Sequence, residues 1–200
     1  MPPRSTSRRR MLDAAGRLFR AGGYHATGLN QVLSEGQAPK GSFYFHFPGG
    51  KEQLAAEAMR EAAEHIRELL VEVVRRAPDA AGAVGAVIDH LGAELAASEY
   101  RCGCPLAGVA MDAAGDSAVI ASACAEGYQS WRDALVGLLG QHGVPGERRA
   151  GLATVALAAI EGGLLLARTE RSLAPLHEVR DHLAATFAQA SRVDAEQLER

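Results

Sequence analysis

Apolar residues recur along most of this chain at spacings of three and four, which is the period of an amphipathic helix. Glycine and proline fall between these stretches and mark the helix ends. The spacing predicts helices over about 8–22, 28–35, 39–47, 51–76, 79–98, 105–114, 117–140, 147–170 and 175–190. Ser7 is the predicted N-cap of the first helix and Thr27 that of the second. No segment is convincing as a strand, so the sequence predicts an all-α protein of nine helices.

One short segment has a second possible interpretation. Phe43, Phe45 and Phe47 alternate with other residues, as the side chains on one face of a strand would. No other strand-like segment exists to pair with this one, and a lone strand is not stable. In a helix that begins near Pro39, Phe43 and Phe47 share one face and pack inward, while Tyr44 lies on the exposed side. We therefore predict a helix.

Together with the preceding short helix and tight turn, this helix forms a predicted helix-turn-helix over about 28–47. The second helix of such a motif can enter the DNA major groove, where its first residues read base edges. Phosphate contacts are expected where a helix begins, because free N–H groups and the helix dipole favour an anion there. The predicted DNA-binding residues are Thr27, Lys40, Gly41, Ser42, Tyr44, Phe45, His46 and Lys51.

Charge is distributed unevenly along the chain and supports a polyanionic partner for the first part. Residues 1–50 contain seven Arg or Lys and two Asp or Glu, whereas residues 51–200 contain fourteen and twenty-two. The only two lysines, Lys40 and Lys51, bracket the aromatic cluster. Charge alone would favour an ordinary solvated surface. The clustering of lysines and aromatics together favours DNA.

The N-terminal quarter resembles a known family. Residues 7–55 read SRRRMLDAAGRLFRAGGYHATGLNQVLSEGQAPKGSFYFHFPGGKEQLA, which is similar to the pattern of TetR-type transcriptional repressors. The extra glycine in PGGKEQL, and CPLAG and WRDAL further on, are typical of the LmrA/YxaF-type branch. The resemblance implies a homodimeric repressor that a small-molecule inducer releases from double-stranded operator DNA. It implies a DNA-binding domain over 1–50 and a domain for ligand binding and dimerisation over 51–200.

The resemblance also assigns roles that periodicity leaves open. The last two helices would form either a core within one chain or a four-helix bundle between two chains, and the resemblance favours the bundle. The expected interface residues are Leu157, Ile160, Leu164, Leu176, Val179, Leu183 and Phe187. Large residues on the middle helices are the expected ligand pocket, although a core role is the commoner one: Met59, Ile66, Leu106, Met111, Tyr128 and Trp131. Few charged residues point inward, so we expect an apolar or aromatic inducer.

Two positions depart from the family pattern. Gln37 stands where glycine is usual, with Gly36 one place earlier. Either the turn shifts by one residue or Gln37 adopts a left-handed conformation at some cost. Gly28 stands where a second threonine is usual, which removes one possible phosphate contact.

Other functions have weaker support. Cys102 and Cys104 could sense oxidants or bind a metal, yet C-x-C is a weak signal and no nearby histidine completes a site. A small helical carrier is the other alternative. No G-x-S-x-G, H-E-x-x-H or phosphate loop is present, so we predict no enzyme, cofactor or metal. No run of about 18 apolar residues or signal-peptide core is apparent, so we expect a cytoplasmic protein with no membrane partner.

Overall fold

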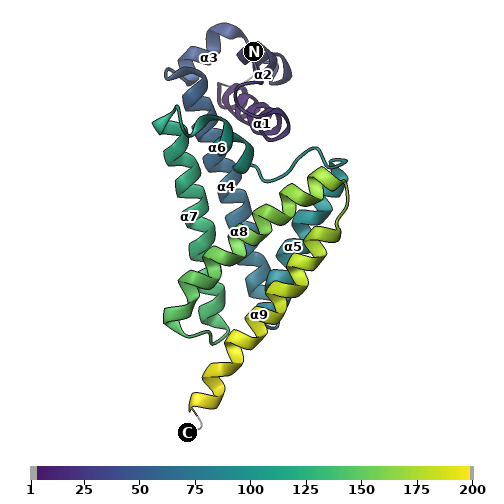
Figure 1. The fold of residues 1–200 in the computed structure, drawn as a ribbon. Helices are drawn as coiled ribbons and strands as arrows, with labels where there is room; N and C mark the ends of the chain where they lie inside the picture. Colours follow the sequence, from purple (N-terminus) through teal and green to yellow (C-terminus); the bar gives the residue numbers. More distant parts are fainter. Residues whose placement is uncertain (1–3, 199–200) are drawn as a thin grey trace. The chain divides into compact units, whose positions relative to one another are not determined.

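The computed structural model describes residues 4–198, with side chains for residues 7–191, and it is helical almost throughout (Figure 1). No strand occurs in this described part, which confirms the all-α prediction. The nine helices within it are α1 (Arg4–Gly22), α2 (Leu29–Glu35), α3 (Lys40–His46), α4 (Gly50–Arg76), α5 (Ala80–Ala97), α6 (Ala107–Ala113), α7 (Ala118–Gln141), α8 (Gly146–Glu170) and α9 (Ala174–Leu198).

The helix ends are set by local polar contacts, with some corrections to the predicted caps. The Asp79 carboxylate accepts a hydrogen bond from Gly82 N at 2.7 Å and caps α5. Ser117 Oγ accepts from Ile120 N at 3.3 Å at the start of α7. The predicted cap at Ser7 is wrong, because α1 begins earlier, at Arg4, and Ser7 is buried within it. The N-cap of α2 is Gly28 rather than Thr27.

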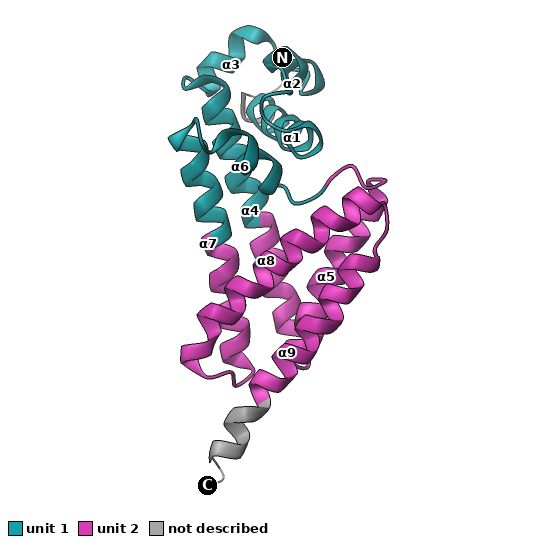
Figure 2. Cartoon of the chain, viewed as in Figure 1, with its two compact units in different colours: residues 1–64, 103–128 teal, residues 65–102, 129–200 magenta. Residues whose placement is uncertain are grey.

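The chain divides into two compact units, shown in different colours in Figure 2. Unit 1 comprises Met1–Glu64 and Gly103–Tyr128, and unit 2 comprises His65–Cys102 and Gln129–Arg200. The boundary falls inside α4 and α7 rather than at residue 50. The domain division expected from the sequence remains a prediction, and its residues 1–3 and 199–200 lie outside the described part.

In unit 1, α1, α2 and α3 share a core of large apolar side chains. Phe43 and Phe47 from α3 and its end are fully buried, with ring centroids 5.5 Å apart. Leu12 and Phe19 of α1 are buried as well, and α1 contacts both α2 and α3. This confirms the predicted in-and-out register of α3, which fixes the face that it presents to solvent.

In unit 2, α9 packs against both α5 and α8. Gly92 of α5 and Gly163 of α8 face Leu176 of α9, and a Cβ on each would lie 3.5 and 3.2 Å from that side chain. Glycine at position 163 therefore allows close contact between α8 and α9 within one chain.

Helices α5 and α8 are long and apolar enough to cross a membrane by length and composition, with mean hydropathies of 1.2 and 1.8. Neither helix is an uninterrupted apolar run, which is why the sequence did not indicate a membrane span. A core helix of a soluble protein passes the same test, and both helices pack against α9 here. The finding is therefore weak evidence for a membrane span.

Candidate nucleic-acid interface and ligand cavity

Helix α3 begins after Pro39, whose φ of −64° and ψ of 139° place it just outside the helix. Proline suits this place because the first N–H groups of a helix have no partner within it. The first residues of the helix, Lys40 and Gly41, are exposed to solvent. These are the positions expected to read base edges.

Two adjacent aromatic side chains lie on the outer face of α3. Tyr44 is 55% exposed and Phe45 is 65% exposed, while His46 beside them is half-buried. The rings of Phe45 and His46 meet edge to face with centroids 5.2 Å apart. Exposed aromatics beside a lysine form a surface that offers apolar contact, a hydroxyl and a positive charge together.

Gly41 and Ser42 leave the start of α3 accessible. Nothing in the chain lies within 4 Å of a Cβ built on Gly41, so packing within the protein does not require glycine there. The Ser42 hydroxyl donates to Pro39 O at 2.8 Å, which leaves its oxygen able to accept from a partner.

The turn between α2 and α3 explains the displaced glycine. Ala38 N donates to Leu33 O at 2.9 Å and Gln37 N to Ser34 O at 3.1 Å, the two hydrogen bonds of a Schellman motif. Gln37 takes the left-handed position with φ of 48°, so the second of the two alternatives is correct. A Cβ on Gly36 would lie 3.2 Å from Arg10 O of α1, so glycine is favoured one place early by helix packing.

Two predicted phosphate ligands are engaged inside unit 1. Thr27 is buried, and its hydroxyl donates to Gly23 O at 2.8 Å. Lys51 Nζ donates to Tyr24 O at 2.6 Å and lies 4.1 Å from the centre of the Tyr24 ring. Partial burial lowers the pKa of Lys51, and the nearby Asp112 carboxylate opposes that shift. The contact of Lys51 could not be predicted from the sequence pattern, because it joins residues 27 positions apart in the chain.

The six predicted pocket residues are divided between the two units. Met59, Leu106, Met111 and Tyr128 belong to unit 1, and Ile66 and Trp131 to unit 2. Met111 is 85% exposed, whereas Leu106, Met59 and Trp131 are buried. Their pocket role remains a prediction.

Gly127, one helical turn before Trp131, does not leave room for a ligand. A Cβ on Gly127 would lie 2.7 Å from Leu106 and 2.8 Å from Ala63. Glycine is required here by close contact of these elements. The sequence alone does not show whether a glycine allows close packing or lines an open space.

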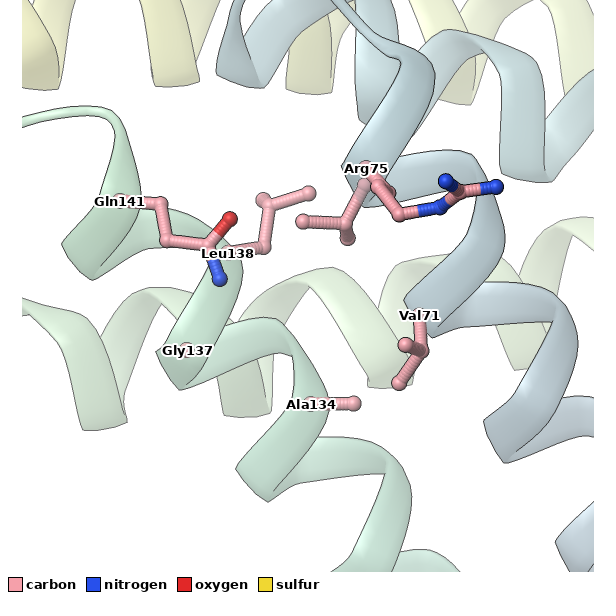
Figure 3. A pocket seen from close by; sticks show the side chains of 7 residues that line it. Val71, Arg75, Ala134, Gly137, Leu138 and Gln141 are labelled. Atoms are coloured by element: carbon pink, nitrogen blue, oxygen red, sulfur yellow. The ribbon is translucent and has the colours of Figure 1, made fainter.

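Unit 2 contains a cavity of about 340 Å³ between the last turns of α4 and α7 (Figure 3). Its walls are mostly aliphatic, and the side chains of Leu138 and Gln141 extend toward the opposite wall. The seven lining residues are Val71, Val74, Arg75, Ala134, Gly137, Leu138 and Gln141. Trp131 is buried and lies one helical turn before Ala134, a lining residue on the same helix. No sequence pattern predicts the cavity, because its lining residues come from two distant segments.

The predicted dimer residues are largely buried in a single chain. Ile160, Leu164, Leu176, Leu183 and Phe187 are buried, and Leu157 and Val179 are half-buried. By contrast, Val155, Leu165 and Leu166 of α8 are each more than half exposed. These three were missed because α8 is apolar on all its faces, and its period cannot tell a core face from an outer face.

The cysteines are not joined by disulfides. Cys102 and Cys104 fall in different units, and burial raises the pKa of the Cys124 thiol, which disfavours the reactive thiolate. No group of three or more His, Cys, Asp or Glu that could hold a metal occurs among the described residues.

Comparison with known proteins agrees with this geometry. Residues 11–58 match the bacterial regulatory proteins of the tetR family, and residues 80–182 match the C-terminal domain of LmrA/YxaF-like transcriptional regulators. The HTH-type transcriptional regulator LmrA of Bacillus subtilis is 40% identical over 85% of this chain and 90% of its own. YxaF of the same organism, an uncharacterized HTH-type regulator, is 34% identical over 88% of this chain and 92% of its own.

A solved TetR-family regulator from Cytophaga hutchinsonii has the same fold, with a TM-score of 0.81, 21% identity and coverage of 95% of this chain and 97% of its own. The fold and site, with the family models and the LmrA relative, define the class as a helix-turn-helix transcriptional regulator. This chain belongs to the TetR family and, within it, to the LmrA/YxaF-like regulators, and it acts by binding DNA.

Proposed function

We propose that the protein is a homodimeric repressor that binds a near-palindromic operator in the cytoplasm and is released by a small molecule. The observation that carries the proposal is the outer face of α3. Tyr44 and Phe45 are exposed there, beside the accessible start of the helix at Lys40. Exposed aromatics on a short helix are unfavourable in water unless a partner covers them. A DNA backbone, with its phosphates and sugars, suits this combination.

The outer face of α8 supports the homodimer. Val155, Leu165 and Leu166 leave aliphatic area uncovered on a long helix. Two copies related by a twofold axis would bury the same area on each other, as isologous interfaces do. The half-buried Leu157 would lie at its margin, so the interface proposed here is shifted around α8 from the one expected from sequence.

The cavity between α4 and α7 is the proposed site for the small molecule. Its volume of about 340 Å³ is at the lower end of the range for small-molecule sites. Aliphatic walls favour an apolar or aromatic compound, and the Gln141 amide can donate to or accept from one polar group on it.

A fluorescence titration tests the ligand part of this proposal. Trp131 is the only tryptophan, so the intrinsic emission reports one place, one turn from the cavity wall. A panel of small aromatic compounds is titrated while release from operator DNA is followed in parallel. We expect a compound that releases DNA to change the Trp131 emission over the same concentrations, because binding and release are linked. Release with unchanged emission would place the site elsewhere.

A cavity-filling variant sharpens the test. Nothing lies within 4 Å of a Cβ built on Gly137, so Gly137→Leu projects into open space at the cavity. We expect it to bind operator normally but to need at least about tenfold more compound for release. Ala125→Leu adds an apolar side chain to an exposed position on the same helix and is the control, expected to respond like the wild type.

A further inference from the structure

The loop between α1 and α2 is held from two sides within unit 1. From α4, Lys51 Nζ donates to Tyr24 O at 2.6 Å. From α6, Asp112 Oδ2 accepts a hydrogen bond from His25 N at 2.8 Å. Consecutive residues of one loop are thus bound by side chains of two different helices.

The backbone of the loop is shaped around the Asp112 carboxylate. Gly23 has φ of 82°, and a Cβ built on it would lie 2.9 Å from Asp112 Oδ2. Both the left-handed conformation and the close approach of the carboxylate require glycine. A second hydrogen bond lies between neighbouring segments. Arg20 Nε of α1 donates to Gly103 O, in the segment just before α6, at 2.7 Å.

Lys51 and Asp112, the two side chains that hold the loop, have opposite charges and attract each other. The Asp112 carboxylate raises the pKa of Lys51, against the larger opposing effect of burial. His25 N, bound to an ionised acceptor, makes a hydrogen bond of the stronger kind. The loop geometry therefore depends directly on where Asp112 lies.

The hydrogen bond between His25 and Asp112 joins two parts of the chain that match different family models. The loop lies within residues 11–58, which match the DNA-binding part of the family, and α6 lies within 80–182, which match the C-terminal domain. The loop leads into α2, and the tight turn after α2 sets the direction of α3.

We propose that Asp112 is a positioning residue for DNA binding, because its carboxylate holds the loop between α1 and α2 in the conformation that leads into the helix-turn-helix. The inference rests on DNA binding by this protein and not on the identity or site of an inducer. The proposal gives Asp112, which lies outside the helix-turn-helix, a role in DNA binding.

The test compares Asp112→Ala with Asp112→Asn on an operator duplex selected with the wild-type protein, at one fixed salt concentration. We expect Asp112→Ala to bind about tenfold more weakly, since its loop loses a charge-assisted hydrogen bond. Asp112→Asn keeps an oxygen that accepts from His25 N, so we expect it to stay within about threefold of the wild type. Asp116→Ala removes the same charge from an exposed nearby position and should bind at least as tightly as the wild type.

Amide hydrogen exchange distinguishes positioning from a general loss of stability. We expect faster exchange in Asp112→Ala at loop residues 23–27 and unchanged exchange in α1 at residues 11–19. Equal acceleration in α1, or an unfolded variant, would show a merely structural role and overturn the proposal. Operator affinity of Asp112→Ala equal to that of Asp116→Ala would overturn it too. A wild-type protein that selects no duplex would instead contradict the proposed function.

Discussion

Helices α3 and α8 both expose apolar side chains, but the two surfaces differ in kind. On α3 the exposed residues are Tyr44 and Phe45, close to the accessible Lys40. On the middle and later turns of α8 they are aliphatic, with Leu165 and Leu166 adjacent. Aromatic rings with a hydroxyl and a nearby charge suit a wet, polyanionic partner, whereas an aliphatic face suits a dry contact with another protein surface.

The inner faces of the two helices also carry apolar side chains, and these are buried. Phe43 on α3 is buried directly next to the exposed Tyr44, and Ile160 on α8 is buried five positions from the exposed Leu165. Apolar character alone therefore does not tell which residue holds the fold and which meets a partner. The variants below separate these roles, from the largest expected effect to the smallest.

The largest effect is expected on the buried face of α8. Ile160→Glu would place a charge among apolar side chains without a partner, which costs at least about 3 kcal/mol in the free energy of unfolding. We expect a protein that is unfolded or melts far below the wild type, as measured by circular dichroism during heating.

Leu165→Glu combined with Leu166→Glu is the matched change on the exposed face. These side chains are already more than half exposed, so we expect a folded protein that sediments as a monomer and binds operator poorly. A folded double variant that remains a dimer would move the interface away from α8.

The next effect concerns α3. Tyr44→Ala should weaken operator binding by about tenfold to a thousandfold, the loss expected for one or two good contacts, and should change the melting temperature little. Phe43→Ala removes a fully buried ring and should destabilise the fold by about 3–5 kcal/mol. The measurements are fluorescence anisotropy with labelled operator and thermal melting. A large drop in melting temperature for Tyr44→Ala would contradict its assignment to the outer face.

A smaller effect distinguishes the two lysines. Lys40 is exposed, so Lys40→Ala should reduce the salt dependence of operator binding by about one unit of slope. Lys51 is bound to Tyr24 O, so Lys51→Ala should leave the slope nearly unchanged and reduce stability by about 1 kcal/mol. Equal slopes for the two variants would show that Lys51 reaches a phosphate in the complex.

The smallest effect is expected at the turn before α3. Gln37 adopts a left-handed conformation with φ of 48°, which is unfavourable for any residue with a Cβ. Gln37→Gly removes that strain and increases the flexibility of the unfolded chain, so we expect a net gain of about 0.5–1 kcal/mol. Thermal melting should show a rise of a few degrees. No rise, or a fall, would indicate that Gln37 makes a compensating contact.

Local patterns were sufficient to predict the helices and the register of α3. The i, i+4 pair of Phe43 and Phe47 identifies the inner face, and glycine and proline mark the helix ends. The extended start of α1 was missed, because the polar residues before Ser7 carry no periodic signal.

The rest of the candidate site depends on contacts between distant segments. The engagement of Lys51 with Tyr24 and of Asp112 with His25 requires the packing of α4 and α6 on the loop after α1. The cavity between α4 and α7 has the same origin. The sequence of α8 is equally apolar on several sides. Only burial in the folded chain distinguishes the exposed Leu165 from the buried Ile160.

The most direct measurement of the central claim is the sequencing of genomic DNA fragments retained at low salt by the wild-type protein and by Tyr44→Ala in parallel. We predict that the wild type enriches a near-palindromic sequence with half-sites about one helical turn apart, roughly 10 base pairs, and that Tyr44→Ala loses this enrichment. No enriched sequence with the wild type, or the same enrichment with both proteins, would contradict operator recognition through the outer face of α3.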